Sequence, residues 1–309
     1  MTWTVVSSSP SFGRYSDEPL DLLRRAGCQV TLLTPGERPA LEVGLSRADA
    51  WIVGFEPVDG STLDDATGVR VVAKCGAGMD NFDRTYLEGR GVAAVNVPGG
   101  NSDAVAEYTM GQLLALARGV AANDSSIRAG HWGPTVGTGL AGRRLGIVGF
   151  GRIGQRLASL ATAFGMTVVA TDPEMDDAAI AAHGAEPREL DSLLRDADVV
   201  SLHVPLVEAT RNLIDADQLA RMPAHAFLLN CSRGGVVDED ALVEALHAGR
   251  LGGAALDVFA HEPLPAGSPL FGAPNLLLSS HTAGYSDTAL HTVAMQCAQN
   301  VLDALEATR

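Results

Sequence analysis

The chain has 309 residues, of which 46% are hydrophobic, so it can bury a sizeable core and is long enough for two domains. It carries 22 Lys and Arg against 37 Asp and Glu, and this net charge of -15 argues against nucleic acid and anionic membranes as partners. Its four cysteines are far apart and form no CxxC pair, which favours neither zinc nor a disulfide framework and fits a reducing cytoplasm.

The elements alternate along the whole chain, with short Val-rich apolar runs separated by longer helical stretches. This alternation predicts parallel sheets with helical crossovers, and strands that are apolar on both faces suit a sheet covered by helices on both sides. The first series of strands is predicted at 3–7, 30–33, 50–53, 69–74 and 92–97. The second is predicted at 144–150, 167–171, 199–203, 226–230, 253–257 and 275–279.

Two helical stretches connect these series. Residues 99–123 are predicted to form one long linking helix, because Val105, Met110, Leu113 and Leu114 recur at helical spacing. The C-terminal stretch 287–306 is also helical in pattern and is expected to return to the first domain. The predicted fold is therefore α/β, with two Rossmann- or flavodoxin-like domains: a split domain of 1–98 plus 285–309 and an inserted domain of 99–284.

A glycine-rich loop follows the apolar strand that opens the second series. Gly149, Gly151 and Gly154 form GxGxxG between a strand and a helical run, which is the full context of a dinucleotide-binding loop. The first glycine permits a tight turn, the second lets the backbone approach a pyrophosphate, and the third lets the helix pack on the strand. We expect 99–284 to bind NAD and the split domain to bind the substrate.

The coenzyme preference depends on Asp172, which ends the next strand. Its carboxylate can accept hydrogen bonds from the ribose hydroxyls and would repel a 2′-phosphate, so NAD is favoured over NADP. Arg152 lies close enough in sequence to leave dual use open. If Asp172 only caps a helix before Pro173, the preference is undetermined.

Polar residues follow the later strands of the second series, where parallel sheets place their ligands. Oxidation of a 2-hydroxy acid needs a base for the hydroxyl proton, a cation for the carboxylate and a nicotinamide to take the hydride. His281 is the candidate acid/base, Glu262 the carboxylate that orients it, and Arg233 the clamp for the substrate. His203 with Glu262 and His281 could also be drawn as a metal site, but no metal-binding spacing supports it and none is expected.

Seven motifs in order resemble the D-isomer-specific 2-hydroxyacid dehydrogenases, and their order is most similar to that of 3-phosphoglycerate dehydrogenases. They are GAGMDN at 76–81, NSDAVAE at 101–107, GFGRIG at 149–154, HVP at 203–205, NCSRGG at 230–235, ALDVF at 255–259 and HTAG at 281–284.

The resemblance implies roles for further residues. Arg233 would bind the carboxylate and polarise the keto oxygen, His281 would exchange the proton, and Asp257 would meet the nicotinamide carboxamide. Lys74, Gly76, Ala77, Gly78 and Asn101 would line the substrate site. Further cofactor contacts would come from Arg152, Ile153, His203, Val204, Pro205, Thr210, Cys231, Ala283 and Gly284. The resemblance also implies a homodimer formed through the linking helix.

The substrate remains open among small anionic 2-oxo and 2-hydroxy acids. Glu262 stands where similar formate dehydrogenases carry Gln, so formate is not expected. Lys74 and Gly54 stand where two arginines are expected in phosphoglycerate dehydrogenases, so hydroxypyruvate, glyoxylate and phosphonopyruvate stay beside 3-phosphoglycerate. The sequence ends at Arg309, so feedback through a serine-sensing domain is not expected.

Two other functions fit parts of the sequence. Corepressors that resemble this family use the fold to sense NAD and bind proteins, and turnover of any 2-oxo acid would distinguish the enzyme from them. Oxidation of phosphite would need a larger cationic pocket than Arg233 and Lys74 supply. Cys75 and Cys231 are expected to pack as small residues. The N-terminus lacks the pattern of a signal peptide and no apolar run is long enough to span a membrane, which predicts a cytoplasmic protein.

Overall fold

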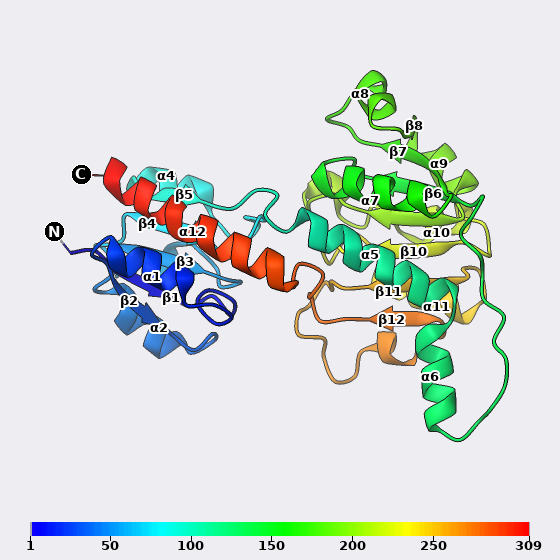
Figure 1. Ribbon diagram of the computed structural model, residues 1–309, viewed down its shortest axis with the longest axis horizontal. Coiled ribbons are helices and arrows are strands. Elements are labelled where there is room, and N and C mark those ends of the chain that lie inside the picture. Colours follow the sequence, from blue (N-terminus) through cyan, green and yellow to red (C-terminus); the bar gives the residue numbers. More distant parts are fainter. Residues whose placement is uncertain (1, 309) are drawn as a thin grey trace. The chain divides into compact units, whose positions relative to one another are not determined.

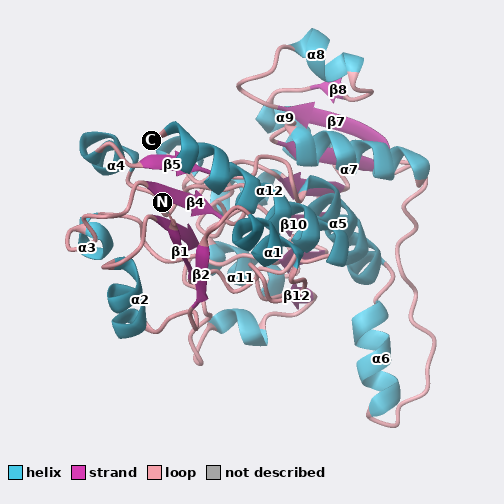
Figure 2. Ribbon diagram, turned by 60° about the vertical axis from the view of Figure 1, so that its left-hand side comes forward, coloured by secondary structure: helices cyan, strands magenta, loops and turns pink. Residues whose placement is uncertain are grey.

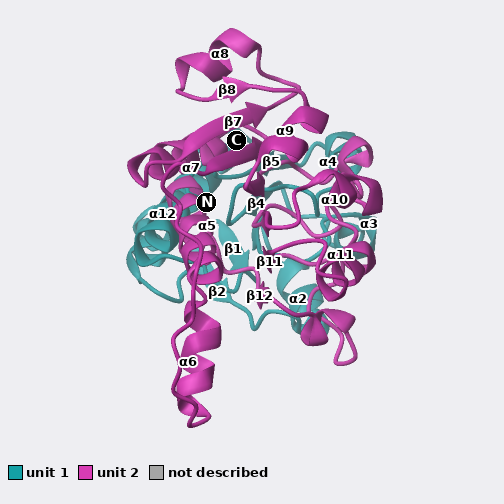
Figure 3. Ribbon diagram, turned by 90° about the vertical axis from the view of Figure 1, so that its right-hand side faces the viewer, with its two compact units in different colours: residues 1–101, 285–309 teal, residues 102–284 magenta. Residues whose placement is uncertain are grey.

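The computed structural model describes residues 2–308, and Met1 and Arg309 lie outside the described part. The chain divides into two compact units, residues 1–101 with 285–309 and residues 102–284 (Figure 3). Each unit is an α/β layer structure with its own parallel sheet and its own core (Figure 1).

Unit 1 contains a five-stranded parallel sheet in the order β2-β1-β3-β4-β5. The sheet is covered on both faces, because α1 and α12 contribute to one core that includes Phe12 and Leu23, and α2, α3 and α4 to another that includes Trp51. Its strands are β1 (Thr4–Ser7), β2 (Gln29–Leu32), β3 (Ala50–Val53), β4 (Val71–Lys74) and β5 (Ala93–Val95). Its helices are α1 (Glu18–Arg25), α2 (Arg38–Leu45), α3 (Gly60–Leu63), α4 (Arg84–Arg90) and α12 (Asp287–Ala307).

Helix α12 joins unit 1 from the far end of the chain. The hydroxyl of Ser286 accepts a hydrogen bond from the Ala289 N–H at 3.1 Å and so caps the first turn. The helix then packs against α1, β4 and β5, and its buried side chains, among them Val293, Cys297 and Val301, enter the core. The burial of this apolar face attaches the C-terminal segment to the N-terminal domain.

Unit 2 contains a seven-stranded parallel sheet in the order β12-β11-β10-β9-β6-β7-β8. Helices α5 and α7 cover one face, and α9, α10 and α11 cover the other. The strands are β6 (Arg144–Val148), β7 (Thr167–Thr171), β8 (Glu186–Pro187), β9 (Val199–Leu202), β10 (Phe227–Asn230), β11 (Gly253–Leu256) and β12 (Leu276–Leu278). The helices are α5 (Ser102–Ala117), α6 (Val120–Arg128), α7 (Arg152–Ala163), α8 (Asp177–Ala182), α9 (Leu190–Asp196), α10 (Ala216–Arg221) and α11 (Glu239–His247), with short 3₁₀ turns η1 (Glu208–Thr210) and η2 (Pro269–Gly272).

The stretch predicted as one linking helix is two helices. Gly119 adopts a φ of 60°, which ends α5 and begins α6 in a new direction. Helix α6 buries none of its described side chains, and with the following loop it extends away from the rest of unit 2 (Figure 2). The loop returns to α5 where the Thr138 N–H donates to the Ala117 carbonyl at 2.7 Å. The hydrophobic periodicity did not reveal this break, because a single glycine hardly changes the pattern of apolar residues.

Candidate active site

The order of strands in unit 2 determines where a ligand can enter. Strand β6 pairs with β7 on one side and with β9 on the other, so the crossovers leave it in opposite directions. In parallel sheets of this kind, a crevice opens beyond the carboxyl ends of the strands at this switch point. Gly149 follows β6 and His203 follows β9, and both lie at this position.

Each glycine of the loop occupies a different steric environment. Gly149 has a φ of 90°, and a Cβ there would lie 2.5 Å from the His203 carbonyl oxygen. A Cβ on Gly154 would lie 2.5 Å from the Gly149 carbonyl oxygen, whereas one on Gly151 would meet no described atom within 4 Å. Gly149 and Gly154 therefore allow the turn and the helix packing, while Gly151 leaves open space on the ligand side.

The first turn of α7 lies directly behind this open space. Within the described residues no side chain caps the helix at Gly151, so its leading amides keep their capacity to donate. A dinucleotide pyrophosphate is an acceptor of the charge and size that such a helix end binds. The loop therefore fits a dinucleotide on its own geometry, and Arg152 is exposed at the first helical position.

Asp172 is held at the end of β7 by backbone amides. One carboxylate oxygen accepts the Phe150 N–H at 2.6 Å, and the other accepts the Glu174 N–H at 2.8 Å. The side chain is partly exposed, and each carboxylate oxygen has a second lone pair that can accept a ribose hydroxyl. Asp172 thus links the glycine loop to the end of β7.

The segment after β9 contains four more predicted cofactor residues. The imidazole of His203 contacts the Ser201 hydroxyl through Nε2 at 2.8 Å, and its buried Nδ1 has no hydrogen-bond partner within residues 2–308. Burial lowers the pKa of His203 to about 4, so this imidazole is neutral at physiological pH. The hydroxyl of Thr210 donates to the Pro205 carbonyl at 2.5 Å and holds the loop, while Val204 is buried beside Gly149.

A small apolar cluster brings together three predicted residues that lie far apart in sequence. Ile153, Cys231 and Ala283 pack with Val105 of α5. Burial raises the pKa of the Cys231 thiol to about 12, and this thiol donates a hydrogen bond to the Gln112 side-chain oxygen at 3.2 Å. The thiol is therefore an unreactive packing group. Gly284 is the last residue of unit 2.

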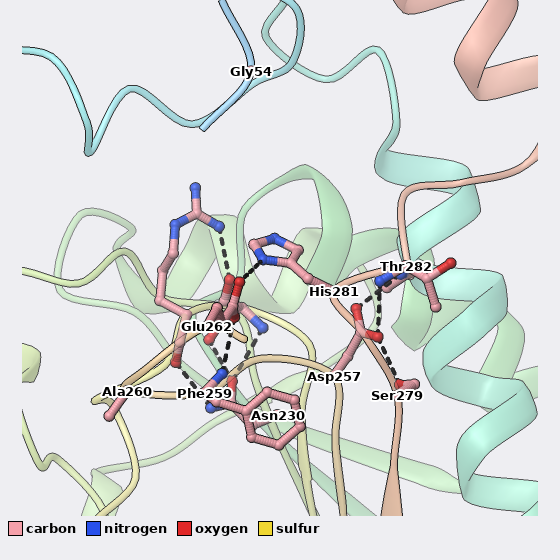
Figure 4. A network of polar contacts seen from close by, with 12 residues as sticks. Gly54, Asn230, Asp257, Phe259, Ala260, Glu262, Ser279, His281 and Thr282 are labelled. Carbon is pink, nitrogen blue, oxygen red and sulfur yellow. Dashed lines mark hydrogen bonds and ion pairs between the residues drawn. The ribbon is translucent and has the colours of Figure 1, made fainter. Parts of the chain in front are cut away.

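His281 and Glu262 form a hydrogen-bonded pair (Figure 4). Nδ1 of His281 lies 2.8 Å from one oxygen of Glu262, and the other oxygen accepts the Phe259 N–H at 3.0 Å. Burial by itself raises the pKa of the Glu262 carboxyl. The hydrogen bonds from His281 and Phe259 and the charges of His281 and Arg233 outweigh burial and lower it. Glu262 is thus an ionised carboxylate in direct contact with the His281 imidazole.

Asp257 holds the turn that carries His281. Its fully buried carboxylate accepts hydrogen bonds from the Ser279 hydroxyl at 2.6 Å, the Thr282 N–H at 2.9 Å and the Ala283 N–H at 2.8 Å (Figure 4). Its backbone carbonyl accepts the His281 N–H at 2.7 Å. His281 has a φ of 53°, an unusual value for a side chain of this size, and these bonds hold it there.

Two residues of this network are absent from the sequence prediction. Gln112 of α5 donates to the Ser279 hydroxyl at 2.9 Å, and Ser279 in turn donates to Asp257. The buried chain therefore runs from α5 to the His281 turn. Ser279 follows β12 directly and could have been found by its strand-end position, whereas Gln112 lies in an apolar helical pattern that gives no such signal.

Arg233 lies in a loop that is tied to the next strand end. Asn230 accepts the Ser232 N–H at 3.0 Å and donates to the Arg233 carbonyl at 2.9 Å. A Cβ on Gly234 would lie 1.8 Å from the Phe259 carbonyl oxygen, so only glycine allows the two loops to touch. This contact brings the charge of Arg233 near enough to Glu262 to contribute to its lowered pKa.

The predicted substrate residues of unit 1 form a separate group after β3 and β4. The ammonium of Lys74 donates to the Gly54 carbonyl and to Oδ1 of Asn81, the latter at 3.1 Å, and lies 5.1 Å from the Phe55 ring centroid. A Cβ on Gly54 would lie 2.6 Å from Pro10 Cδ. A side chain at position 54 would therefore meet Pro10 unless the N-terminal loop moved.

The loop after Lys74 is held against β5 and its extension. Gly76 accepts the Val97 N–H at 2.9 Å, and the Ala77 carbonyl accepts the Asn96 side-chain amide at 2.6 Å. Gly78 and Asn101 are partly exposed. In residues 2–308 no three His, Cys, Asp or Glu side chains are grouped as metal ligands. No described helix is both long enough and apolar enough to cross a membrane.

Comparisons with known proteins agree with this arrangement. Residues 110–283 match the family described as "D-isomer specific 2-hydroxyacid dehydrogenase, NAD binding domain". The chain is 34% identical to glyoxylate/hydroxypyruvate reductase B of Yersinia pestis over 310 residues. This alignment covers 97% of the chain and 95% of the reductase. It is 36% identical to D-3-phosphoglycerate dehydrogenase of Synechocystis sp. over 279 residues. This alignment covers 86% of the chain and 50% of the dehydrogenase.

The chain spans about half the length of the phosphoglycerate dehydrogenases that it matches. Among solved structures it resembles the TT0316 protein of Thermus thermophilus, with a TM-score of 0.89 and 35% identity. That match covers 98% of this chain and 97% of the other.

Proposed function

Since the chain belongs to the D-isomer-specific 2-hydroxyacid dehydrogenase family, we propose that it transfers a hydride between NAD(H) and a small anionic 2-hydroxy or 2-oxo acid. The observation that carries the proposal is the hydrogen-bonded pair of His281 and Glu262 in the same unit as the glycine loop. Residues 99–284 would bind the coenzyme, and residues 1–98 with 285–309 would contribute the substrate-binding wall.

The proposed mechanism assigns one task to each catalytic residue. Arg233 binds the substrate carboxylate and polarises the keto oxygen. Nδ1 of His281 is bonded to Glu262, so Nε2 is the atom that donates the proton to that oxygen during reduction and removes it during oxidation. Glu262 stabilises the protonated imidazole. The bound coenzyme supplies or accepts the hydride at its nicotinamide.

The coenzyme assignment has support at both ends of the loop. Asp172 presents a carboxylate at the strand end where ribose hydroxyls are bound in dinucleotide folds, and this charge disfavours a 2′-phosphate. Asp257 would meet the nicotinamide carboxamide. Further contacts would come from Arg152, Ile153, His203, Val204, Pro205, Thr210, Cys231, Ala283 and Gly284.

The substrate proposal depends on unit 1. Lys74 supplies a positive charge beside the loop of Gly76, Ala77 and Gly78, with Asn101 as a further lining residue. A single ammonium suits hydroxypyruvate, glyoxylate or phosphonopyruvate at least as well as 3-phosphoglycerate, because Gly54 leaves no arginine for a phosphate. The acids in the names of the relatives, which are glyoxylate, hydroxypyruvate and 3-phosphoglycerate, belong to the same class of small anionic acids.

We also propose a cytoplasmic homodimer. Helix α6 and the loop after it expose Trp132 to 92%, Val136 to 98% and Val120 to 57%. Apolar side chains gathered on a projecting arm are typical of a surface that another copy covers. Among residues 2–308 no cysteine is in a disulfide, which fits a reducing compartment.

The function is tested by NADH consumption with a panel of 2-oxo acids and, in reverse, with 3-phosphoglycerate, each repeated with NADPH. We expect turnover of at least one acid, with kcat/KM higher for NADH. His281→Ala and Arg233→Ala should each lower kcat/KM by about 100-fold or more, because proton transfer and charge stabilisation are lost. NADH binding, measured by fluorescence titration, should persist. Unchanged turnover in either variant contradicts the mechanism, and NADH binding without turnover of any acid favours a sensing role.

A further inference from the structure

Gln112 is a buried polar residue on the face of α5 that packs against the sheet of unit 2. It is 8% exposed, and α5 contacts β10, β11 and β12, the three strands whose following segments carry the candidate catalytic residues. Other buried side chains of this helix, among them Met110 and Leu113, are apolar. A buried amide costs free energy unless both of its ends are hydrogen-bonded, so an apolar residue would serve packing alone better.

Both ends of the Gln112 side chain are bonded, and each end is bonded to a different loop. Its oxygen Oε1 accepts a hydrogen bond from the Cys231 thiol at 3.2 Å, and its nitrogen Nε2 donates to the Ser279 hydroxyl at 2.9 Å. Cys231 lies two residues before Arg233, and Ser279 lies two residues before His281. One amide therefore connects the Arg233 loop with the His281 turn.

The donors of this chain of hydrogen bonds all point toward one acceptor. A hydroxyl has a single proton, and because Gln112 donates to Ser279, that proton is available for Oδ1 of Asp257, which accepts it at 2.6 Å (Figure 4). Burial raises the pKa of Cys231 to about 12, so this thiol keeps the proton that it donates to Gln112. The chain thus runs in one direction, from Cys231 to Asp257, and the amide of Gln112 defines that direction.

We propose that Gln112 is a positioning residue that fixes the Arg233 loop and the His281 turn relative to each other, a role that rests on the proposed function. The link to the turn runs through Asp257, which accepts the Thr282 N–H and, at its backbone carbonyl, the His281 N–H. These bonds hold His281 at its unusual φ of 53°. The carboxylate clamp and the proton donor act on one small molecule, so a shift of either relative to the other slows the chemical step.

Gln112→Met tests the amide, because methionine has a similar length and can make neither hydrogen bond. We expect kcat for reduction to fall by about 10-fold, since the two catalytic loops lose their common link. NADH consumption at a saturating concentration of the 2-oxo acid measures this change. Leu113→Ala is the matched control on the same helix. Leu113 is fully buried in an apolar cluster, so its truncation should lower stability and leave kcat close to that of the wild type.

Gln112→Glu adds a readout that a packing role would not move. Only a protonated carboxyl can both donate to Ser279 and accept from Cys231. The titratable groups that this side chain faces are Cys231 after β10 and, through Ser279, Asp257 after β11. Burial and the charge of Asp257 favour the protonated carboxyl at about pH 5, so kcat should there be close to that of the wild type. It should fall relative to the wild type as the pH rises, whereas the ratio for Gln112→Met should stay constant.

Hydrogen exchange tests the positioning without any turnover. The Thr282 and Ala283 N–H groups are bonded to Asp257, so their exchange reports how firmly the His281 turn is held. In Gln112→Met, residues 280–284 should exchange faster relative to residues 144–148 of β6. In Leu113→Ala this ratio should equal that of the wild type.

Two results overturn the proposal. One is a Gln112→Glu variant that is no more active at about pH 5 than Gln112→Met. The other is a Gln112→Met variant in which the relative exchange of residues 280–284 is unchanged, whatever its kcat. If the wild type turns over no acid while Gln112→Met exchanges faster in this segment, only the proposed function is contradicted.

Discussion

The carboxyl of Glu262 lies one-third exposed between a backbone amide and the imidazole of His281. Its charge is set by these neighbours, because burial alone would raise its pKa and the hydrogen bonds and nearby positive charges lower it. A carboxylate with a lowered pKa stays ionised at neutral and mildly acidic pH. In the proposed mechanism, this ionised carboxylate is the partner that supports proton transfer by the imidazole.

Glu262→Gln should change the pH dependence of reduction. A neutral amide stabilises an imidazolium less than a carboxylate does, so the alkaline limb of the kcat/KM profile should move to lower pH. Stopped-flow measurement of NADH oxidation between pH 5 and 9 gives the profile. A profile that falls in amplitude without moving would mean that Glu262 only positions the ring.

Asp198 provides a matching test on stability. Burial raises the pKa of Asp198, but the Arg144 N–H, the Arg143 guanidinium and His225 lower it, at 2.8, 2.7 and 2.9 Å. Because the folded pKa is the lower one, this stabilisation is present above the unfolded value of about 3.9 and is lost as pH falls through the folded value. Asp198→Asn should lower the free energy of unfolding by about 1–3 kcal/mol at pH 7 in urea titrations.

The difference between wild type and Asp198→Asn should shrink as the pH is lowered below the folded pKa. Asp196→Asn is the control, because that side chain is 46% exposed and lies 3.7 Å from Arg144. A surface pair of this kind contributes about 0–1 kcal/mol. A difference between wild type and Asp198→Asn that does not depend on pH would assign the effect to packing.

At the scale of the elements, the site depends on how closely the loops after β10 and β11 approach each other. Gly234 permits the contact, since a Cβ there would meet the Phe259 carbonyl oxygen at 1.8 Å. Arg233 precedes this glycine and Glu262 follows Phe259, so the contact sets the distance between Arg233 and the hydrogen-bonded pair of Glu262 and His281.

Gly234→Ala should separate these loops. We expect kcat/KM to fall by about 10-fold or more and the free energy of unfolding to fall by about 1–3 kcal/mol. Gly272→Ala is the control, because a Cβ at that position meets no described atom within 4 Å. Steady-state kinetics with urea unfolding checks both effects. Equal kinetics for the two variants would show that the loop contact is not needed.

At the scale of the complete chain, the arm of α6 and its loop exposes large apolar side chains. Trp132→Asp with Val136→Asp places two charges on it, and we expect the double variant to sediment as a 32.1 kDa monomer while the wild type sediments as a dimer. Phe271→Asp, at a position that is 57% exposed outside the arm, should leave the dimer intact. A monomeric wild type contradicts the proposed dimer.

Local sequence signals were enough to predict the α/β class, every strand except the two-residue β8, and the positions of Arg233, Glu262 and His281 after their strands. Periodicity and strand-end position can be read from residues that are close in sequence. A parallel sheet places the ends of its strands at the same edge, so the residues that follow these strands come together. Gly119 shows the limit of the periodic signal, because one left-handed residue split a predicted helix without disturbing its pattern.

Which distant residues meet became known only from the folded chain. Gln112 reaches the Asp257 network from another helix, Pro10 excludes a side chain at Gly54, and Cys297 joins the core of unit 1 from the far end of the chain. The spacing of these residues in the sequence predicts none of these contacts. They arise from the packing of helices on sheets, where the relevant distance is measured through space and the separation along the chain has no influence.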